Sequence, residues 1–185
     1  DDWGACDVLF CSGTDPFETK ATLFATQIMR GARPNKVLIC ATPHRTTGVA
    51  WALKRGGVWL PVLPGTDSVL HQAIARLIVE RGWQDQAFID RWVASRWEVD
   101  QGLGRGTRNT PWQWRTTWGT WQSDWADYRA FLLARDEHRL DQAARITGVD
   151  AAAIERAAEL LARPRADGSR PRASFMLEKG NYWSN

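Results

Sequence analysis

The chain has 185 residues, of which 44% are hydrophobic and 24% are charged, a composition typical of a globular domain and not of a disordered chain. Its formal net charge of +3 is too small to indicate nucleic acid as a partner. The longest apolar runs are only a few residues, so we expect no membrane-spanning helix.

The first third of the chain alternates between buried-strand and helix patterns. DVLFCS (7–12), KVLICA (36–41) and VWLPV (58–62) are apolar runs typical of strands buried on both faces. Helical spacing of apolar residues lies between them, over 17–32 and 46–55. The β-α-β-α-β order predicts an α/β fold, a doubly wound, Rossmann-like parallel sheet with flanking helices.

The rest of the chain predicts helices, one long loop and a returning strand. We expect the loop over 98–122, which lacks periodicity and is rich in Trp and Arg, and the strand ASFMLEKG over 173–180. The expected helices span 67–81, 85–95, 123–135, 140–147 and 150–162.

We expect all of these parts to belong to one α/β domain. Residues 1–97 hold the β-α-β-α-β unit and two helices, and the Trp/Arg-rich loop over 98–122 follows. Residues 123–164 are helical, and 172–185 return as a strand. Because the chain ends inside NYWSN, we expect it to be a fragment that stops within the domain.

Small and polar residues follow each of the first three expected strands, as Gly13-Thr14-Asp15, Thr42-Pro43-His44-Arg45 and Gly65-Thr66-Asp67. Open α/β sheets bind ligands in the crevice outside the carboxyl ends of their strands. There, glycine lets the backbone approach a ligand, and a carboxylate accepts hydrogen bonds from adjacent N–H donors such as those of guanine. These residues could equally serve as helix caps. The sequence has neither a G-x-G-x-x-G nor a Walker A motif.

Other residues predict structural roles. Cys6, Cys11 and Cys40 lie in or beside apolar runs and are expected to be small buried hydrophobic groups, not metal ligands. We expect His71 to be structural or solvent-facing and His138 to be exposed.

Several motifs in order resemble the molybdopterin oxidoreductases of the dimethyl sulfoxide reductase superfamily. They are DVLFCSGTDPFETKATLF, TPHRTTG, LPGTDSVLHQAIARLIVERGWQDQAFID and ITGVDAAAIERAAELLA. The closing FMLEKGNYWSN is most similar to the arsenite oxidase branch, which includes related iodate reductases. One departure is Thr42, which stands where the family has the acidic residue of an Asp-Pro-Arg turn.

The resemblance implies part of the catalytic subunit of a molybdenum enzyme that transfers oxygen atoms to or from an oxyanion, as arsenite oxidase does. Reduction of iodate or another oxyanion is the alternative. The implied cofactor is molybdenum bis(molybdopterin guanine dinucleotide), with an iron–sulfur cluster upstream of this stretch. The implied partners are an iron–sulfur small subunit and an electron carrier, with no nucleic acid, and the implied compartment is the periplasm.

The resemblance also implies which residues bind the cofactor. Asp67 would accept hydrogen bonds from guanine, and the other turn residues would lie against the nucleotide or the pterin. It implies no catalytic residue and no metal ligand in this stretch. The implied cofactor-binding residues are Gly13, Thr14, Asp15, Thr19, Arg45, Gly65, Thr66, Asp67, Lys179 and Gly180.

The Trp/Arg-rich loop leaves a different class of function open. Arginines between tryptophans, as in 105–118, are typical of a platform for single-stranded nucleic acid, where bases stack on the rings. The same residues could form a protein-binding module, or could pack against another domain.

Overall fold

The structure is a computed structural model that describes residues 2–30, 36–93, 124–178 and 180. The chain divides into two compact units. Residues 1–83 and 136–185 form the first, which we call the sheet unit, and residues 84–135 form the second, the small unit.

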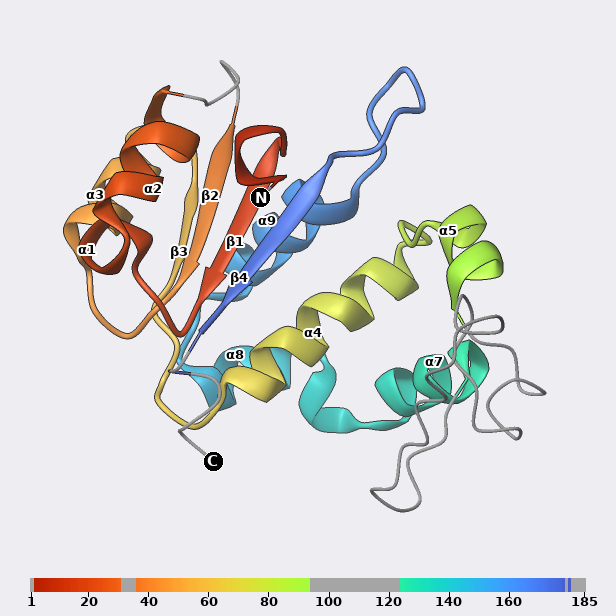
Figure 1. The fold of residues 1–185 in the computed structure, drawn as a ribbon. Coiled ribbons are helices and arrows are strands. Elements are labelled where there is room, and N and C mark those ends of the chain that lie inside the picture. The colour runs from red at the N-terminus through yellow and green to blue at the C-terminus, as the bar shows by residue number, and fades with distance from the viewer. Residues whose placement is uncertain (1, 31–35, 94–123, 179, 181–185) are drawn as a thin grey trace, which may run out of the picture. The chain divides into compact units, whose positions relative to one another are not determined.

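The sheet unit is built on four parallel strands (Figure 1). They are β1 (Val8–Ser12), β2 (Val37–Ala41), β3 (Val58–Leu60) and β4 (Ala173–Leu177), in the order β3-β2-β1-β4. The returning strand β4 therefore pairs with the first strand and not with its neighbour in sequence. The predicted α/β class with a parallel sheet is confirmed.

Helices cover both faces of the sheet (Figure 1). One face packs against α4 (Asp67–Glu80), α8 (Leu140–Thr147) and α9 (Ala151–Ala162). The other packs against the N-terminal helices and α3 (Thr47–Leu53). The longest of these helices has 14 residues, and no helix within the described ranges is long and apolar enough to cross a membrane.

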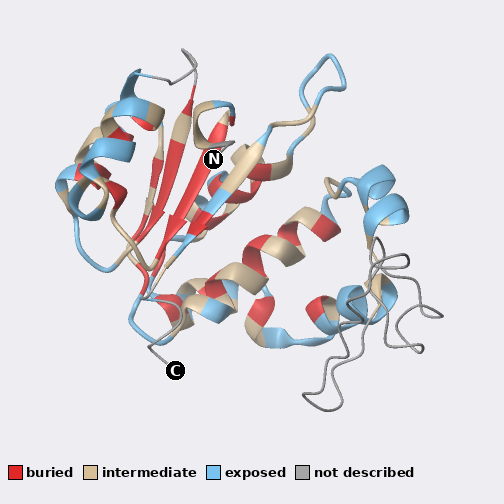
Figure 2. Cartoon of the chain, in the orientation of Figure 1, coloured by how far each residue is buried: buried red, intermediate tan, exposed pale blue. Residues whose placement is uncertain are grey.

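The two faces divide the apolar residues of each strand between two cores. Phe10 and Ile39 point into the core under α4 and α9, whereas Leu9 and Leu38 point into the core under α3. Successive side chains of a strand point to opposite faces, and here both faces are covered. This explains why every residue of β1 is buried, as the continuous red of the central strands in Figure 2 shows.

The helix predicted over 17–32 is interrupted. It consists of α1 (Pro16–Thr19), α2 (Ala21–Leu23) and a π-helix, η2 (Phe24–Arg30). Lys20 leaves the helical conformation, with φ −139° and ψ 49°, and its ammonium group forms an ion pair with Glu178, 2.5 Å away. Glu178 follows β4 and is distant from Lys20 in sequence, so the hydrophobic periodicity of residues 17–32 could not predict this contact.

Most other helices match their predicted spans closely. Asp150 caps α9 by accepting a hydrogen bond from the Ala152 N–H at 2.7 Å, as the sequence predicts. Short 3-10 turns, η1 (Asp2–Gly4) and η3 (Asp136–His138), complete the sheet unit.

The small unit contains α5 (Gln86–Trp92) and α7 (Trp125–Ala134). Asp85 caps α5, and Asp124 and Asp127 form a reciprocal capping box at the start of α7. The predicted Trp/Arg-rich loop over 98–122 lies outside the described residues.

Candidate functional site

The polar turns meet at one edge of the sheet unit. A cavity of about 430 Å³ lies at the carboxyl ends of β1, β2 and β3. Parallel strands end at the same edge of a sheet, so turns that are far apart in sequence converge there. The predicted residues that line this cavity are Gly13, Thr14, Asp15, Thr19, Gly65, Asp67 and Gly180.

Two further predicted residues, Arg45 and Thr66, do not line the cavity. Arg45 is exposed and does not line the cavity. Thr66 donates its hydroxyl hydrogen to the Leu63 carbonyl at 2.7 Å and so stabilises the turn before α4. Lys179 lies outside the described residues. Thr42, which stands where the family has an acidic residue, lines the cavity.

Two glycines bring the ends of β1 and β4 into backbone contact. The Gly180 N–H donates to the Gly13 carbonyl at 3.1 Å. A Cβ atom on Gly180 would lie only 2.6 Å from the Gly13 Cα, a distance that no side chain tolerates. Gly13 also has a φ of +67°, which favours glycine. The cavity wall formed by these two segments therefore requires glycine on both sides.

The two aspartates of the cavity have different tasks. Asp15 Oδ1 accepts a hydrogen bond from the Phe17 N–H at 2.9 Å and caps α1, while its Oδ2 is buried and lacks a hydrogen-bond partner. Asp67 stands in the first turn of α4, and its carboxylate accepts no hydrogen bond from any residue in the described ranges. The capping role thus applies to Asp15, which keeps one oxygen without a partner, whereas Asp67 has both carboxylate oxygens available to a ligand.

The charge of the cavity favours a particular ligand group. Asp15 and Asp67 are its only charged lining residues within the part of the chain that the structure describes. Carboxylates accept hydrogen bonds and repel anions. The cavity therefore suits a group rich in N–H donors, such as the edge of guanine, better than it suits a phosphate. These properties fit a guanine nucleotide.

His71 connects α4 to the end of β1 beside this cavity. Its Nε2 lies 3.1 Å from the hydroxyl of Ser12, which is completely buried, and its ring meets Phe10 edge-on at 5.5 Å. Burial lowers the pKa of His71, while the nearby Asp67 carboxylate acts in the opposite direction. A neutral imidazole thus joins the two elements that carry Asp67 and Gly13, which agrees with a structural role.

The prediction that His138 is exposed is wrong. His138 is buried in the turn η3, which lies against α4. Its charged neighbours in sequence indicated an exposed residue, but the turn directs the imidazole inward.

The cysteines have the predicted structural role. Cys6, Cys11 and Cys40 are buried and unpaired. Burial, followed by the charge of Asp15, raises the pKa of Cys40 to about 12, and burial likewise raises the pKa of Cys11. These thiols are therefore protonated at neutral pH and chemically inert. The described residues contain no cluster of three His, Cys, Asp or Glu side chains that could hold a metal ion.

The fold of the chain is found in a solved structure of another protein. Acetylene hydratase from Pelobacter acetylenicus superposes with a TM-score of 0.58 over 92% of this chain and 18% of its own, at 21% sequence identity. At this identity the likeness shows the fold alone. No protein-family model matches the chain.

Sequence relatives define the resemblance further. The chain is 62% identical over 186 residues to iodate reductase subunit IdrA of Pseudomonas sp. (strain SCT) and 64% identical over 185 residues to that of Denitromonas iodatirespirans. It is 25% identical over 204 residues to arsenite oxidase subunit AioA of Herminiimonas arsenicoxydans. Each match covers the whole chain.

These matches confirm the resemblance to molybdopterin oxidoreductases of the arsenite oxidase branch, iodate reductases included. Within that branch the chain is far more similar to the iodate reductase subunits than to the arsenite oxidase subunit. The chain spans about a fifth of the length of these relatives, 20% of each iodate reductase subunit and 21% of the arsenite oxidase subunit.

Proposed function

We propose that this chain is part of the catalytic subunit of a molybdenum oxidoreductase that acts on an oxyanion, and that the oxyanion is iodate. The cavity at the strand ends carries this proposal, because it gathers residues from both ends of the chain into a site that suits guanine. Identity of 62% and 64% to iodate reductase subunits supports iodate over arsenite as the substrate.

The cavity would hold the guanine nucleotide of a molybdopterin. Asp67 would accept two hydrogen bonds from the base, because its carboxylate is available and lines the cavity. Gly13 and Gly180 would let the ligand approach the backbone, and the hydroxyls of Thr14 and Thr19 would bind its polar atoms. When bound, the molybdenum cofactor supplies the oxygen-atom transfer chemistry, and these residues hold and orient it.

The complete enzyme would need parts beyond this chain. We extend the proposal to an iron–sulfur cluster in the preceding part of the subunit, a small iron–sulfur partner subunit and an electron carrier. We also propose export to the periplasm. The resemblance to the arsenite oxidase branch supports each of these assignments.

Replacing Asp67 tests the proposal in the full-length subunit. Asp67→Ala should lower both the molybdenum content and the bound guanine, because loss of a charge-assisted hydrogen-bond pair weakens binding by about 10- to 100-fold. Metal analysis and nucleotide release by acid, followed by chromatography, measure the two quantities.

Asp141→Ala is the matched control, since Asp141 is also an acidic residue in the first turn of a helix of the sheet unit, but does not line the cavity. This control should retain full metal and guanine contents. Full contents in Asp67→Ala as well would contradict the proposed nucleotide site.

A further inference from the structure

A second and larger cavity lies at the opposite edge of the sheet unit. It is a groove of about 1020 Å³ between the amino ends of β1 and β2, the end of α9 and the connection over 164–172. We call it the arginine groove after five of its lining residues, Arg156, Arg163, Arg165, Arg170 and Arg172. Two acidic residues, Asp7 and Glu159, line it as well.

The acidic residues of the groove lie beneath the arginines. The side chains of Asp7 and Glu159 are only 17% and 26% exposed. Those of Arg156 and Arg163 are 54% and 61% exposed, and those of Arg165 and Arg172 are 46% and 49% exposed. The surface of the groove therefore presents guanidinium groups.

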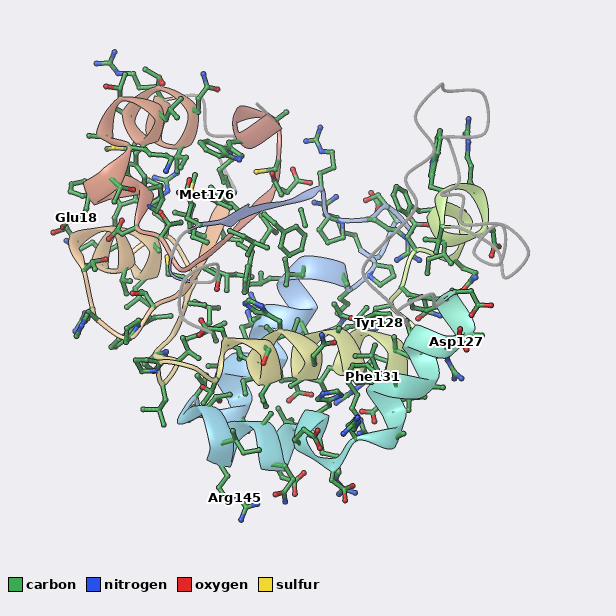
Figure 3. All side chains as sticks on the ribbon, turned by 60° about the horizontal axis from the view of Figure 1, so that its bottom comes forward. Glu18, Asp127, Tyr128, Phe131, Arg145 and Met176 are labelled. Carbon is green, nitrogen blue, oxygen red and sulfur yellow. The ribbon has the colours of Figure 1, made fainter. Side chains whose placement is uncertain are left out.

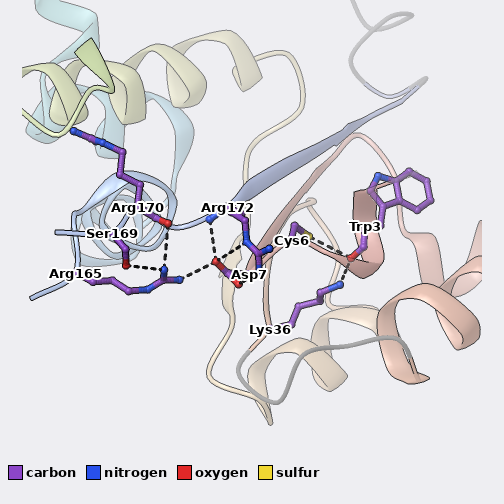
Figure 4. Close-up of polar contacts among 8 residues, drawn as sticks. All are labelled: Trp3, Cys6, Asp7, Lys36, Arg165, Ser169, Arg170 and Arg172. Atoms are coloured by element: carbon purple, nitrogen blue, oxygen red, sulfur yellow. Dashed lines mark hydrogen bonds and ion pairs between the residues drawn. The ribbon is translucent and has the colours of Figure 1, made fainter. Parts of the chain in front are cut away.

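Each carboxylate holds two guanidinium groups in place. Asp7 pairs with Arg165 at 2.8 Å and with Arg172 at 3.1 Å, as Figure 4 shows. Glu159 pairs with Arg156 and Arg163, both at 3.1 Å. A guanidinium has five N–H donors, so the ion pairs leave donors on each of these four arginines. The groove thus carries preorganised cations that can bind further carboxylates.

The groove also concentrates the positive charge of the chain. Five arginines against two carboxylates leave an excess of three positive charges, as large as the formal net charge of the whole chain. A partner of opposite charge is therefore attracted to this edge of the sheet unit.

The composition of the groove favours a polypeptide over a nucleic acid. Its floor includes the apolar Val8, Val37, Leu160 and Pro171, which suit apolar side chains of a partner. Among the residues that the structure describes, no aromatic side chain lines it on which a base could stack, whereas single-stranded nucleic-acid sites depend on such stacking.

We propose that the arginine groove binds an extended acidic segment of another polypeptide chain. Carboxylates of that segment pair with the exposed guanidinium groups, and apolar side chains between them contact the floor. This site is separate from the nucleotide cavity and does not depend on the proposed enzymatic activity.

The test uses the full-length subunit with two arginines replaced, Arg156→Gln together with Arg163→Gln. The probe is a fluorescent peptide of alternating Glu and Leu, and fluorescence anisotropy measures its Kd. We expect wild type to bind it, with an affinity that falls as salt rises. Loss of two charges should raise the Kd about tenfold at low salt.

A matched control removes two arginines from another surface of the same unit. Arg139→Gln with Arg145→Gln causes the same change in net charge at α8, outside the groove, where Figure 3 shows Arg145 directed away from the ribbon. Its Kd should stay within about twofold of wild type. Arg156→Lys with Arg163→Lys keeps the charge and should recover part of the affinity, which separates a binding effect from misfolding.

Three outcomes would overturn the proposal. The first is that the peptide does not bind the wild-type subunit, as it would not if other parts of that subunit covered the groove. The second is that the control substitutions at Arg139 and Arg145 weaken binding as much as the substitutions at Arg156 and Arg163. The third is that a single-stranded oligonucleotide competes with the peptide and binds more tightly, and that its binding depends on Arg156 and Arg163 in the same way.

Discussion

Single residues decide the shape of the cavity at the strand ends, the proposed nucleotide site. Gly13 and Gly180 are separated by most of the chain, yet their backbones touch, with the Gly180 N–H on the Gly13 carbonyl at 3.1 Å. The neighbouring Asp15 uses one carboxylate oxygen to cap α1 and leaves the other without a partner, whereas Asp67 caps no helix with its carboxylate. At this scale the wall of the cavity depends on two glycines, and both aspartates line it.

Gly180→Ala is expected to change the shape of the cavity while leaving every charged side chain of its lining in place. The added methyl would lie 2.6 Å from the Gly13 Cα, so one segment must move, at a cost of about 1–3 kcal/mol. Bound guanine and thermal stability of the full-length subunit should both fall. In Gly4→Ala, the nearest atom to the new methyl is the end of the Gln27 side chain, which can move, so both quantities should remain near wild type.

At the scale of elements, an ion-pair cluster attaches β4 to β1. Asp7 precedes β1, and Arg172 precedes β4. The Asp7 carboxylate accepts hydrogen bonds from the Arg172 side chain and backbone and from Arg165 (Figure 4). The hydrogen bond from the Arg172 side chain, with further help from Arg165, holds the pKa of Asp7 well below its usual range, although partial burial acts in the opposite direction.

Asp7→Asn should therefore destabilise the sheet unit by about 1–3 kcal/mol at neutral pH. Because the folded state lowers the pKa of Asp7, its contribution is fully present above the unfolded value near about 3.9 and is lost as the pH falls further. Thermal unfolding at several pH values measures this. The variant should lose less stability on acidification than wild type does, and an equally steep loss would contradict the assignment.

Asp141→Asn is the control for the Asp7→Asn experiment. Asp141 is an exposed carboxylate that pairs with Arg139 at 3.3 Å on the surface of α8. Solvent screens such a pair, so its removal should change stability little.

For the molecule as a whole, the chain supplies a sheet scaffold with a cavity at its strand ends, which is proposed to bind a nucleotide, while the reacting centre is proposed to lie elsewhere in the subunit. The described residues hold no cluster that could bind a metal ion. We propose that the choice of oxyanion depends on parts of the full-length protein beyond this chain, which spans about a fifth of its relatives' length.

The full-length enzyme is expected to reduce iodate in preference to oxidising arsenite. With a reduced dye as electron donor for iodate and an oxidised dye as acceptor for arsenite, kcat/KM should favour iodate by at least about tenfold. The whole-chain identity of 62% and 64% to iodate reductase subunits, against 25% to the arsenite oxidase subunit, is the reason. Comparable rates on both substrates would contradict this assignment.

Much of the fold was predictable because its signals are local. Apolar runs at 7–12 and 36–41 indicated strands buried on both faces, and the structure has β1 and β2 there. The polar turns after these strands indicated a site, because parallel strands end at one edge. Seven of the ten residues predicted for cofactor binding line the cavity, although their binding roles stay predictions.

The features that were not predictable depend on contacts between distant segments. The break at Lys20 comes with an ion pair to Glu178, and His138 is buried because η3 lies against α4. Arg45 is exposed and does not line the cavity, although its turn follows β2. The arginine groove joins β1 to a connection more than 150 residues later, as the Asp7–Arg165 contact shows.

The sequence by itself determined the strand and helix segments, the α/β class, the glycines and aspartates of the site and the resemblance to molybdopterin oxidoreductases. Only the tertiary structure decided that β4 pairs with β1, that Asp15 and not Asp67 caps a helix with its side chain, and that arginines gather at the opposite edge. The reason is physical. Hydrophobic periodicity is a property of a few consecutive residues, so it predicts single strands and helices. Strand order, hydrogen-bond partners and the distribution of surface charge depend instead on which distant segments lie side by side in the fold.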